Sequence, residues 1–393
     1  MNANLWLLAV CQGLFLTNNV VFIAINGLVG LSLAPAPWMA TLPVMGYVVG
    51  GAVSTSLVAR SQSRWGRQVS FQLGLAVAVF SALLCALAVW LSLFWLLVLA
   101  TFIAGYYSAN GQLYRFAAAE LATAAAREKA ISLVLAGGLI GAIAGPNLAK
   151  FTRTAFTVPF MGAYLALAVV AALAMVLMAR IRFPAPPAQQ AKSMQGRSVL
   201  TLMTQPAFLV AMFAAALGYG VMNLLMAATP LAMQVCGFGF DDAAFVLEWH
   251  VIGMFAPGFF TGHLIKRFGV VTIMGVGVLL NALCIALALS GVELHQFVGA
   301  LFLLGVGWNF LFTGSTTLAL NTYRPEEKDR AQGAINFAVF SVMAMTSLAS
   351  GALVTSHGWT WLNLGSIVPV ALTGALLLWL VWRQARVVKP SEA

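Results

Sequence analysis

Twelve apolar segments, each about as long as a membrane span, dominate this sequence and constrain its fold. A helix needs about 20 apolar residues to cross the hydrocarbon core of a bilayer. Of the 393 residues, 62% are hydrophobic and only 8% are charged, a balance that a water-soluble surface does not tolerate. We therefore predict an all-α integral membrane protein. The segments lie at approximately 5–32, 36–59, 68–91, 94–119, 129–150, 157–180, 207–234, 242–265, 270–291, 294–320, 330–355 and 359–382.

The basic residues indicate the orientation of these segments. If the N-terminus is inside, 18 of the 20 Lys and Arg residues fall at cytoplasmic ends or loops, and only Lys150 and Arg153 fall outside. This asymmetry predicts that both termini are cytoplasmic. The net charge of +10 then reflects topology, and we expect the lipid bilayer and no nucleic acid as a partner.

The chain divides into two similar halves. A stretch with three prolines and four basic residues at 180–198 reads as a cytoplasmic linker. We predict an N-terminal six-helix half at 1–181, a central loop at 182–204 and a C-terminal six-helix half at 205–393. An offset of 203 residues aligns Arg64 with Arg267 and Gly66 with Gly269, so the halves repeat one plan.

Twelve spans, a six-plus-six repeat, a long central loop and two basic glycine-containing loops resemble the major facilitator superfamily. The resemblance covers the whole chain and implies that the halves rock around a site near the membrane midplane. In the first loop, Ala59 and Ser63 stand where the superfamily usually has glycine and aspartate. The resemblance assigns cytoplasmic gate loops to Arg64, Gly66 and Arg67 and to Lys266, Arg267 and Gly269.

Two ionisable residues lie deep within the eighth segment, in VLEWHVIGMF at 246–255. An ionisable group in the hydrocarbon region is a functional candidate by default. His250 has Met254 four residues later on the same helical face, and the preceding segment carries Met222 and Met226 with the same spacing. Three thioethers and one imidazole suit a soft copper ion better than a hard cation.

The expected depths of these residues agree. Glycines at 237–239 predict a turn between the seventh and eighth segments. Met226 and His250 lie twelve residues either side of its centre, and Met222 and Met254 lie sixteen. At a rise of about 1.5 Å per residue, these distances predict two levels with two ligands each near the midplane.

These residues, within TPLAM and WHVIGMFAPGFFTG, resemble those of the CcoA-like copper importers, bacterial carriers that supply copper for cytochrome c oxidase assembly. The resemblance implies that Met222, Met226, His250 and Met254 bind copper as it crosses the bacterial inner membrane to the cytoplasm. It also implies that this copper supplies the assembly of cbb3-type cytochrome oxidase. It also suggests Cys236, at the outer end of the seventh segment, as a thiol relay, although a packed cysteine explains that position equally well.

Three other residues are candidates for coupling or for lining a cavity. Glu248 lies about 200° around the helix from His250, so it either pairs with another helix or takes up a proton during transport. Asn19 and Tyr47 are the first-half counterparts of Met222 and His250 under the offset of 203.

The primary hypothesis is a monomeric secondary copper importer, with the copper ion as transported substrate, no permanently bound cofactor, no enzyme activity and periplasmic or cytoplasmic copper chaperones as candidate partners. One alternative is a proton-coupled carrier of an organic solute, either riboflavin-like vitamin uptake or drug efflux. The segment GAIAGP at 141–146 resembles one frequent in proton-coupled antiporters and favours efflux, although small residues also serve helix packing. A second alternative is a copper sensor that transports nothing.

Overall fold

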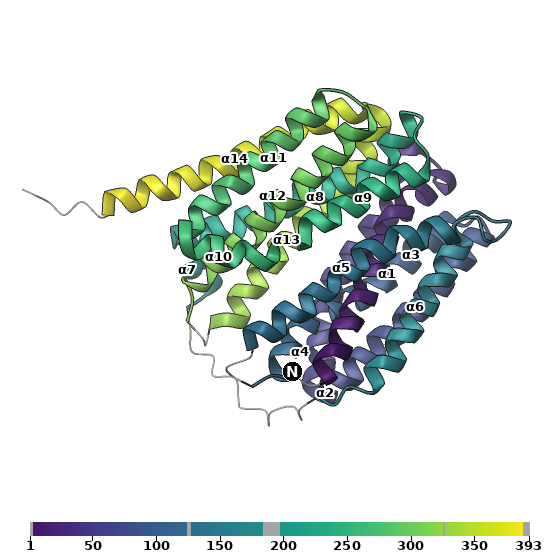
Figure 1. Ribbon diagram of the computed structural model, residues 1–393, viewed down its shortest axis with the longest axis horizontal. Helices are drawn as coiled ribbons and strands as arrows, with labels where there is room; N and C mark the ends of the chain where they lie inside the picture. The colour runs from purple at the N-terminus through teal and green to yellow at the C-terminus, as the bar shows by residue number, and fades with distance from the viewer. Residues whose placement is uncertain (1–2, 124–126, 184–196, 325–326, 388–393) are drawn as a thin grey trace, which may run out of the picture.

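The computed structural model of the chain describes residues 3–123, 127–183, 197–324 and 327–387 (Figure 1), and all regular elements within these ranges are helical. In chain order they are α1 (Ala3–Leu33), η1 (Pro37–Met39), α2 (Leu42–Trp90), α3 (Phe94–Gly111), α4 (Tyr114–Glu120), α5 (Arg127–Thr152), α6 (Met161–Ala179), α7 (Val199–Met203), α8 (Pro206–Val235), α9 (Phe240–Phe255), α10 (Gly258–Phe268), α11 (Val270–Leu289), α12 (Leu294–Leu320), α13 (Lys328–Ser356) and α14 (Gly358–Val387).

The helices account for the twelve predicted spans. Eleven helical segments of the described chain are long and apolar enough to cross a membrane, and the bent pair α9–α10 supplies a twelfth. The span predicted at 242–265 has a break that the sequence analysis did not anticipate. The chain breaks between Phe255 and Gly258, and the two helices meet at a bend of 43°.

Pro257 explains this break, because proline has no backbone N–H and its ring clashes with the preceding helical turn. Asn309 on α12 donates from Nδ2 to the Met254 carbonyl at 2.7 Å. Thr261 Oγ1 lies 2.7 Å from both the Pro257 carbonyl and Asn309 Oδ1. These side chains form hydrogen bonds with backbone carbonyl groups at the break, which lipid could not do. They thereby stabilise the bend that follows Phe255.

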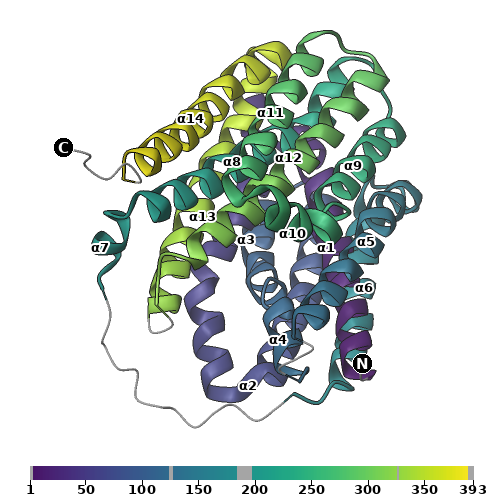
Figure 2. The same ribbon diagram turned by 60° about the vertical axis from the view of Figure 1, so that its left-hand side comes forward.

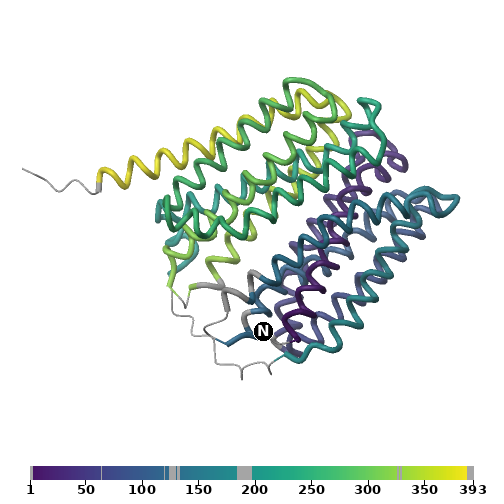
Figure 3. The backbone as a smooth tube through the Cα atoms, in the orientation of Figure 1, coloured from purple at the N-terminus to yellow at the C-terminus, as the bar shows by residue number. Residues whose placement is uncertain are grey.

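The helices form two bundles that lie side by side, one from α1–α6 and the other from α8–α14 (Figures 1 and 3). Figure 2 shows α11 and α14 on the side of the second bundle that faces away from the first. Residues 184–196 of the predicted central loop lie outside the described ranges, and α7 belongs to the remainder of that loop. We call the end of the molecule with the linker the inner end and the opposite end the outer end.

Both halves make the same turn at the inner end. Gly66 separates the second and third spans with φ 79°, and Gly269 separates α10 from α11 with φ 87°. Glycine adopts a positive φ without the steric penalty that a side chain brings. The offset of 203 residues therefore relates structurally equivalent positions in the two halves.

Glycines bring the backbones of α2 and α3 into direct contact. A Cβ atom placed on Gly105 would lie 2.3 Å from the Gly51 nitrogen and 2.4 Å from the Gly50 carbonyl carbon. A Cβ atom on Gly50 would lie 1.9 Å from the Phe102 carbonyl oxygen. Small residues permit such close helix packing within membranes, and no side chain fits at either position.

A charged pair ties the end of the linker to the connection between α12 and α13. The Arg197 side chain donates from Nε and Nη2 to the Glu327 carboxylate at 2.9 and 2.8 Å. The backbone N–H groups of Arg197 and Arg324 donate to the same carboxylate, each at 2.9 Å. Hydrogen bonds from Arg197 and these backbone groups hold the pKa of Glu327 well below its usual range.

Replacing Glu327 with glutamine should lower the Tm of the purified protein at pH 7 by several degrees. A depressed folded-state pKa stabilises the fold fully above the unfolded-state pKa of about 4.3, and this stabilisation decreases as the pH falls toward the folded-state value. Thermal unfolding measured from pH 7 to pH 3 should therefore show a smaller loss of Tm for Glu327→Gln than for the wild type. Parallel curves would contradict this role.

Candidate functional site

A cavity of about 230 Å³ lies between the two halves. Its wall comes from α1, α2, the α3–α4 region and α5 on one side, and from α8, α9, α12 and α13 on the other. The helices α6, α11 and α14 contribute no described lining residue. Because both bundles form the wall, any relative movement of the halves would change access to this space.

The wall of the second half is aromatic. The rings of Trp308 and Phe312 on α12 are stacked, with centroids 5.1 Å apart and an interplanar angle of 9°. Tyr219 on α8 meets both edge-on, at 5.3 Å from Trp308 and 5.5 Å from Phe312. Phe255 on α9 contacts Trp308 at 6.2 Å. All four side chains line the cavity, and together they present flat apolar surface to a ligand.

The first half supplies a smaller mixed wall. Tyr47 on α2 lines the cavity and stacks on Phe22 of α1, with ring centroids 5.3 Å apart and an interplanar angle of 14°. Asn19 and Ile23 also line the cavity, one turn apart on α1. The predicted candidates Asn19 and Tyr47 thus face the space between the halves, opposite the methionines of α8.

Three lining residues have polar atoms that are buried and lack a hydrogen-bond partner among the residues that the structure describes. These atoms are Gln12 Oε1, Arg115 Nε and Trp308 Nε1. Burying an unpaired polar group is costly, so a ligand that pairs with them would gain affinity. Sequence reasoning missed all three. For Trp308, the sequence did contain an indication, because Phe312 lies four residues later on the same helical face. Arg115 was considered only as one of the basic residues that indicate which end of each segment is cytoplasmic.

The four proposed copper ligands divide into two environments. Met222, Met226 and Met254 line the cavity. His250 is fully buried and is not among the lining residues, because its Nδ1 lies 2.7 Å from the Leu301 carbonyl of α12 and the ring is held there. The structure brings three thioethers to one wall and turns the imidazole toward α12, so the four-ligand site stays a prediction.

Helix packing explains the position of His250. α9 packs along α12 and α5 more than along α8. Gly305 of α12 sits so close to α9 that an added Cβ would lie 2.4 Å from the His250 carbonyl oxygen. The predicted turn at 237–239 is present, with Gly237 at φ 85°. The turn alone did not reveal how α9 is rotated about its axis.

The other two candidates lie away from the cavity wall. Glu248 accepts a hydrogen bond from Nδ2 of Asn147 on α5 at 3.1 Å, so it pairs with a helix of the opposite half. Cys236 follows α8 at the outer end and is exposed, and partial burial raises the pKa of its thiol. Neither residue is among those that line the cavity.

The gate-loop residues lie at the inner end. Arg67 forms an ion pair with Glu120 at the end of α4, at 2.6 Å, and also contacts Gln62. Arg64 and Arg267 each lie over the aromatic ring of the next residue, with guanidinium carbons 5.5 and 5.2 Å from the ring centroids. Lys266 is exposed. A role for these residues in opening and closing the inner end stays a prediction.

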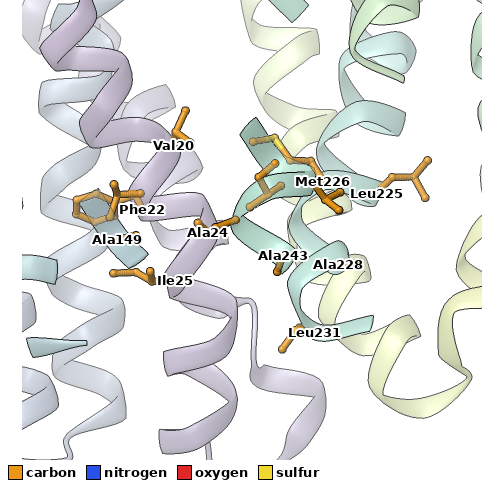
Figure 4. Close-up of a cluster of buried hydrophobic side chains, with 14 of the residues drawn as sticks. Val20, Phe22, Ala24, Ile25, Ala149, Leu225, Met226, Ala228, Leu231 and Ala243 are labelled. Carbon is orange, nitrogen blue, oxygen red and sulfur yellow. The ribbon is translucent and has the colours of Figure 1, made fainter. Parts of the chain in front are cut away.

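Close packing between α1 and α8 joins the halves on the outer side of the cavity. Figure 4 shows Val20 and Ala24 of α1 beside Met226, Ala228 and Leu231 of α8. Further out, Thr41 donates from Oγ1 to the Ser347 carbonyl at 2.6 Å and accepts from the Gly351 N–H at 3.0 Å. These contacts link α2 to α13 on the outer side of the cavity.

Charged residues add a further contact between the two halves at the outer end. Lys150 and Arg153, the two exceptions to the charge asymmetry, each lie 3.3 Å from a carboxylate oxygen of Asp241 at the start of α9. Arg153 also lies over the Phe240 ring, with its guanidinium carbon 4.8 Å from the centroid, and Phe160 contacts that ring at 5.7 Å. We call these five residues the outer contact. It explains why two basic residues occur at the outer end.

Replacing Asp241 with asparagine should make the cavity more accessible from outside, because both ion pairs of the outer contact are lost. Exposed ion pairs contribute up to about 1 kcal/mol, so the opening equilibrium should shift about two- to fivefold. The measurement is the rate at which an impermeant maleimide labels Val20→Cys in a Cys236→Ser background. Asp242→Asn is the control, since the hydrogen bond that Asp242 accepts within the described chain comes from the neighbouring Gly239 N–H. Equal rates for both variants would contradict the prediction.

Comparison with known proteins gives consistent matches along the whole chain. The Major Facilitator Superfamily model matches residues 5–256 and 249–393. The riboflavin transporter RfnT of Brucella anthropi is 36% identical over 364 residues, which cover 92% of this chain and 91% of that protein. The uncharacterized MFS-type transporter YddS of Bacillus subtilis is 25% identical over 374 residues, covering 91% and 86%.

Solved structures show the same arrangement of helices. The nucleoside transporter NupG matches with a TM-score of 0.70 and 13% identity, over 95% of this chain and 99% of that one. A variant of NupG matches with a TM-score of 0.76 and 11% identity, over 95% and 98%. At this identity the similarity concerns the fold alone.

Proposed function

This chain belongs to the Major Facilitator Superfamily, and from that premise we propose that it is a secondary carrier of a flat aromatic organic solute of the riboflavin class. The observation that carries the proposal is the aromatic wall of Tyr219, Phe255, Trp308 and Phe312 beside unpaired polar atoms. Riboflavin combines a flat three-ring system with carbonyl and ring-nitrogen acceptors and a hydroxylated side chain. The similarity to RfnT supports the same class.

The proposed transport cycle uses the two halves as moving parts. With the outer contact formed and α1 packed on α8, the solute would exchange with the inner side. Separation of these contacts would expose the same cavity to the outside. The Tyr219, Trp308 and Phe312 rings all come from the second half, so a solute stacked on them would stay with that half while the first half moved.

Copper import remains the second candidate, because Met222, Met226 and Met254 line the cavity. Two observations favour the organic solute. The Arg115 guanidinium is the only charge among the lining residues that the structure describes, and a fixed cation repels a copper ion strongly where the dielectric is low. In addition, His250 does not line the cavity with the three methionines, although its Nδ1 contact with the Leu301 carbonyl leaves Nε2 without a hydrogen-bond partner among the described residues.

The test is uptake of radiolabelled riboflavin by bacteria that can neither synthesise nor import the vitamin. We expect this protein to give saturable uptake and growth on low riboflavin, with unchanged cell copper. A triple variant, in which Met222, Met226 and Met254 become leucine, should retain most of the uptake because this exchange conserves volume. Copper accumulation that is lost in the triple variant, without riboflavin uptake in the wild type, would favour copper import instead.

A further inference from the structure

Arg115 places a cation on the wall of the cavity, and none of the described carboxylates forms an ion pair with it. It lies at the start of α4 and is half-buried, with its guanidinium carbon 4.9 Å from the Phe116 ring centroid. Its Nε atom is buried without a hydrogen-bond partner, and neither aspartate nor glutamate occurs among the described lining residues. By contrast, two other arginines at the inner end form ion pairs: Arg67 pairs with Glu120, and Arg197 pairs with Glu327.

Placing a charged side chain in such an environment costs folding free energy, so a functional role is the natural explanation for it. A buried charge is normally paired with an opposite charge or fully hydrogen-bonded, and an ionisable residue inside a membrane protein is a functional candidate. The guanidinium group presents a planar fork of N–H donors that fits two adjacent acceptors at once. A ligand with such an acceptor pair would supply the partners that the described part of the protein does not provide.

We propose that Arg115 is a specificity-determining residue that binds the acceptor edge of the transported heterocycle. The inference rests on the proposed function. The ring system stacks on Trp308 and its neighbours Tyr219 and Phe312, and its edge, where a ring nitrogen lies beside a carbonyl oxygen, accepts hydrogen bonds from Arg115. The ligand class is therefore a flat aromatic heterocycle with adjacent nitrogen and oxygen acceptors, and flat hydrocarbons are excluded.

Riboflavin has two such edges, which two analogues distinguish. One edge pairs ring nitrogen 1 with the carbonyl at carbon 2, and the other pairs ring nitrogen 5 with the carbonyl at carbon 4. In 1-deazariboflavin and 5-deazariboflavin a C–H group replaces one of these nitrogens while the ring shape is kept. Each analogue thus removes one acceptor without changing the stacking surface.

The experiment measures binding to the purified full-length protein by competition with radiolabelled riboflavin. Arg115→Met should weaken riboflavin binding about 10- to 100-fold, as expected for loss of hydrogen bonds to a charged group. One deaza analogue should bind the wild type more weakly than riboflavin does, and this difference should disappear in Arg115→Met. Arg115→Lys, which keeps the charge without the fork, should bind riboflavin with intermediate affinity.

The outcomes separate this inference from the proposed function. If the wild type binds riboflavin but Arg115→Met binds it equally well, or if neither analogue differs from riboflavin on the wild type, the role of Arg115 is overturned and the proposed function stands. If the wild type binds no riboflavin, both are overturned. Because the analogues are compared on the wild type, misfolding of a variant would not conceal the result.

Discussion

Gly105→Ala should remove most of the folded protein from the membrane. The new methyl group would lie 2.3 and 2.4 Å from backbone atoms of Gly51 and Gly50, and backbone atoms cannot rotate away as a side chain can. Overpacking of this kind costs about 3 kcal/mol or more when the surroundings cannot adjust. Fluorescence-detected size-exclusion chromatography of a tagged protein would show the lost monodisperse peak, and any remaining protein should have a lower Tm.

The matched control is Gly275→Ala on α11. Nothing lies within 4 Å of a Cβ atom at this position, and alanine is the better helix former by about 1 kcal/mol. We therefore expect normal levels and an unchanged or higher Tm for this variant. Similar behaviour of the two variants would show that α2 and α3 do not need to approach as closely as the structure indicates.

Trp308→Ala should raise the KM for riboflavin uptake about 10- to 100-fold with the protein still correctly inserted. Trp308 stacks on Phe312 and meets Tyr219 and Phe255 edge-on, so its loss removes the centre of the aromatic wall. Stacking of a nucleobase on an aromatic side chain contributes about 1–3 kcal/mol, and a flavin ring offers a comparable flat surface. Initial uptake rates over a range of riboflavin concentrations give the KM.

Two variants control for nonspecific effects of losing a tryptophan. Trp361→Ala removes a side chain that is 61% exposed and should leave the KM unchanged. Trp308→Phe keeps a ring at the site and should recover much of the affinity. A normal KM in Trp308→Ala would contradict stacking on this wall and would return these rings to a purely structural role.

The Asn147–Glu248 hydrogen bond joins the two halves of the molecule. Glu248 belongs to α9 and Asn147 follows Pro146 on α5, so this bond must break if the two helices move apart. The neighbouring GAIAGP segment packs against α1, where an added Cβ on Gly141 would lie 2.5 Å from the Leu16 Cβ. Packing therefore explains these small residues, and the segment gives no separate support for drug efflux.

Several features followed from the sequence because they depend on length, composition or local geometry. Apolar runs long enough to cross a bilayer predicted twelve spans, and the helices account for them. The orientation that the Lys and Arg distribution predicts stays a prediction. The repeated glycine at positions 66 and 269 marked the same turn in both halves, where a positive φ is needed. The glycines at 237–239 likewise marked the turn between α8 and α9.

Only the tertiary structure decided which faces of the helices meet the cavity. In a membrane, lipid and protein interior are both apolar, so hydrophobicity does not distinguish a lipid-facing side chain from a cavity-facing one. The rotation of α9 toward α12 therefore could not be read from the sequence, and it leaves His250 outside the set of residues that line the cavity. Three further features could not be predicted from the sequence: the aromatic cluster around Trp308, the position of Arg115 on the cavity wall and the ion pair of Lys150 with Asp241. Each depends on contacts between residues far apart in the chain.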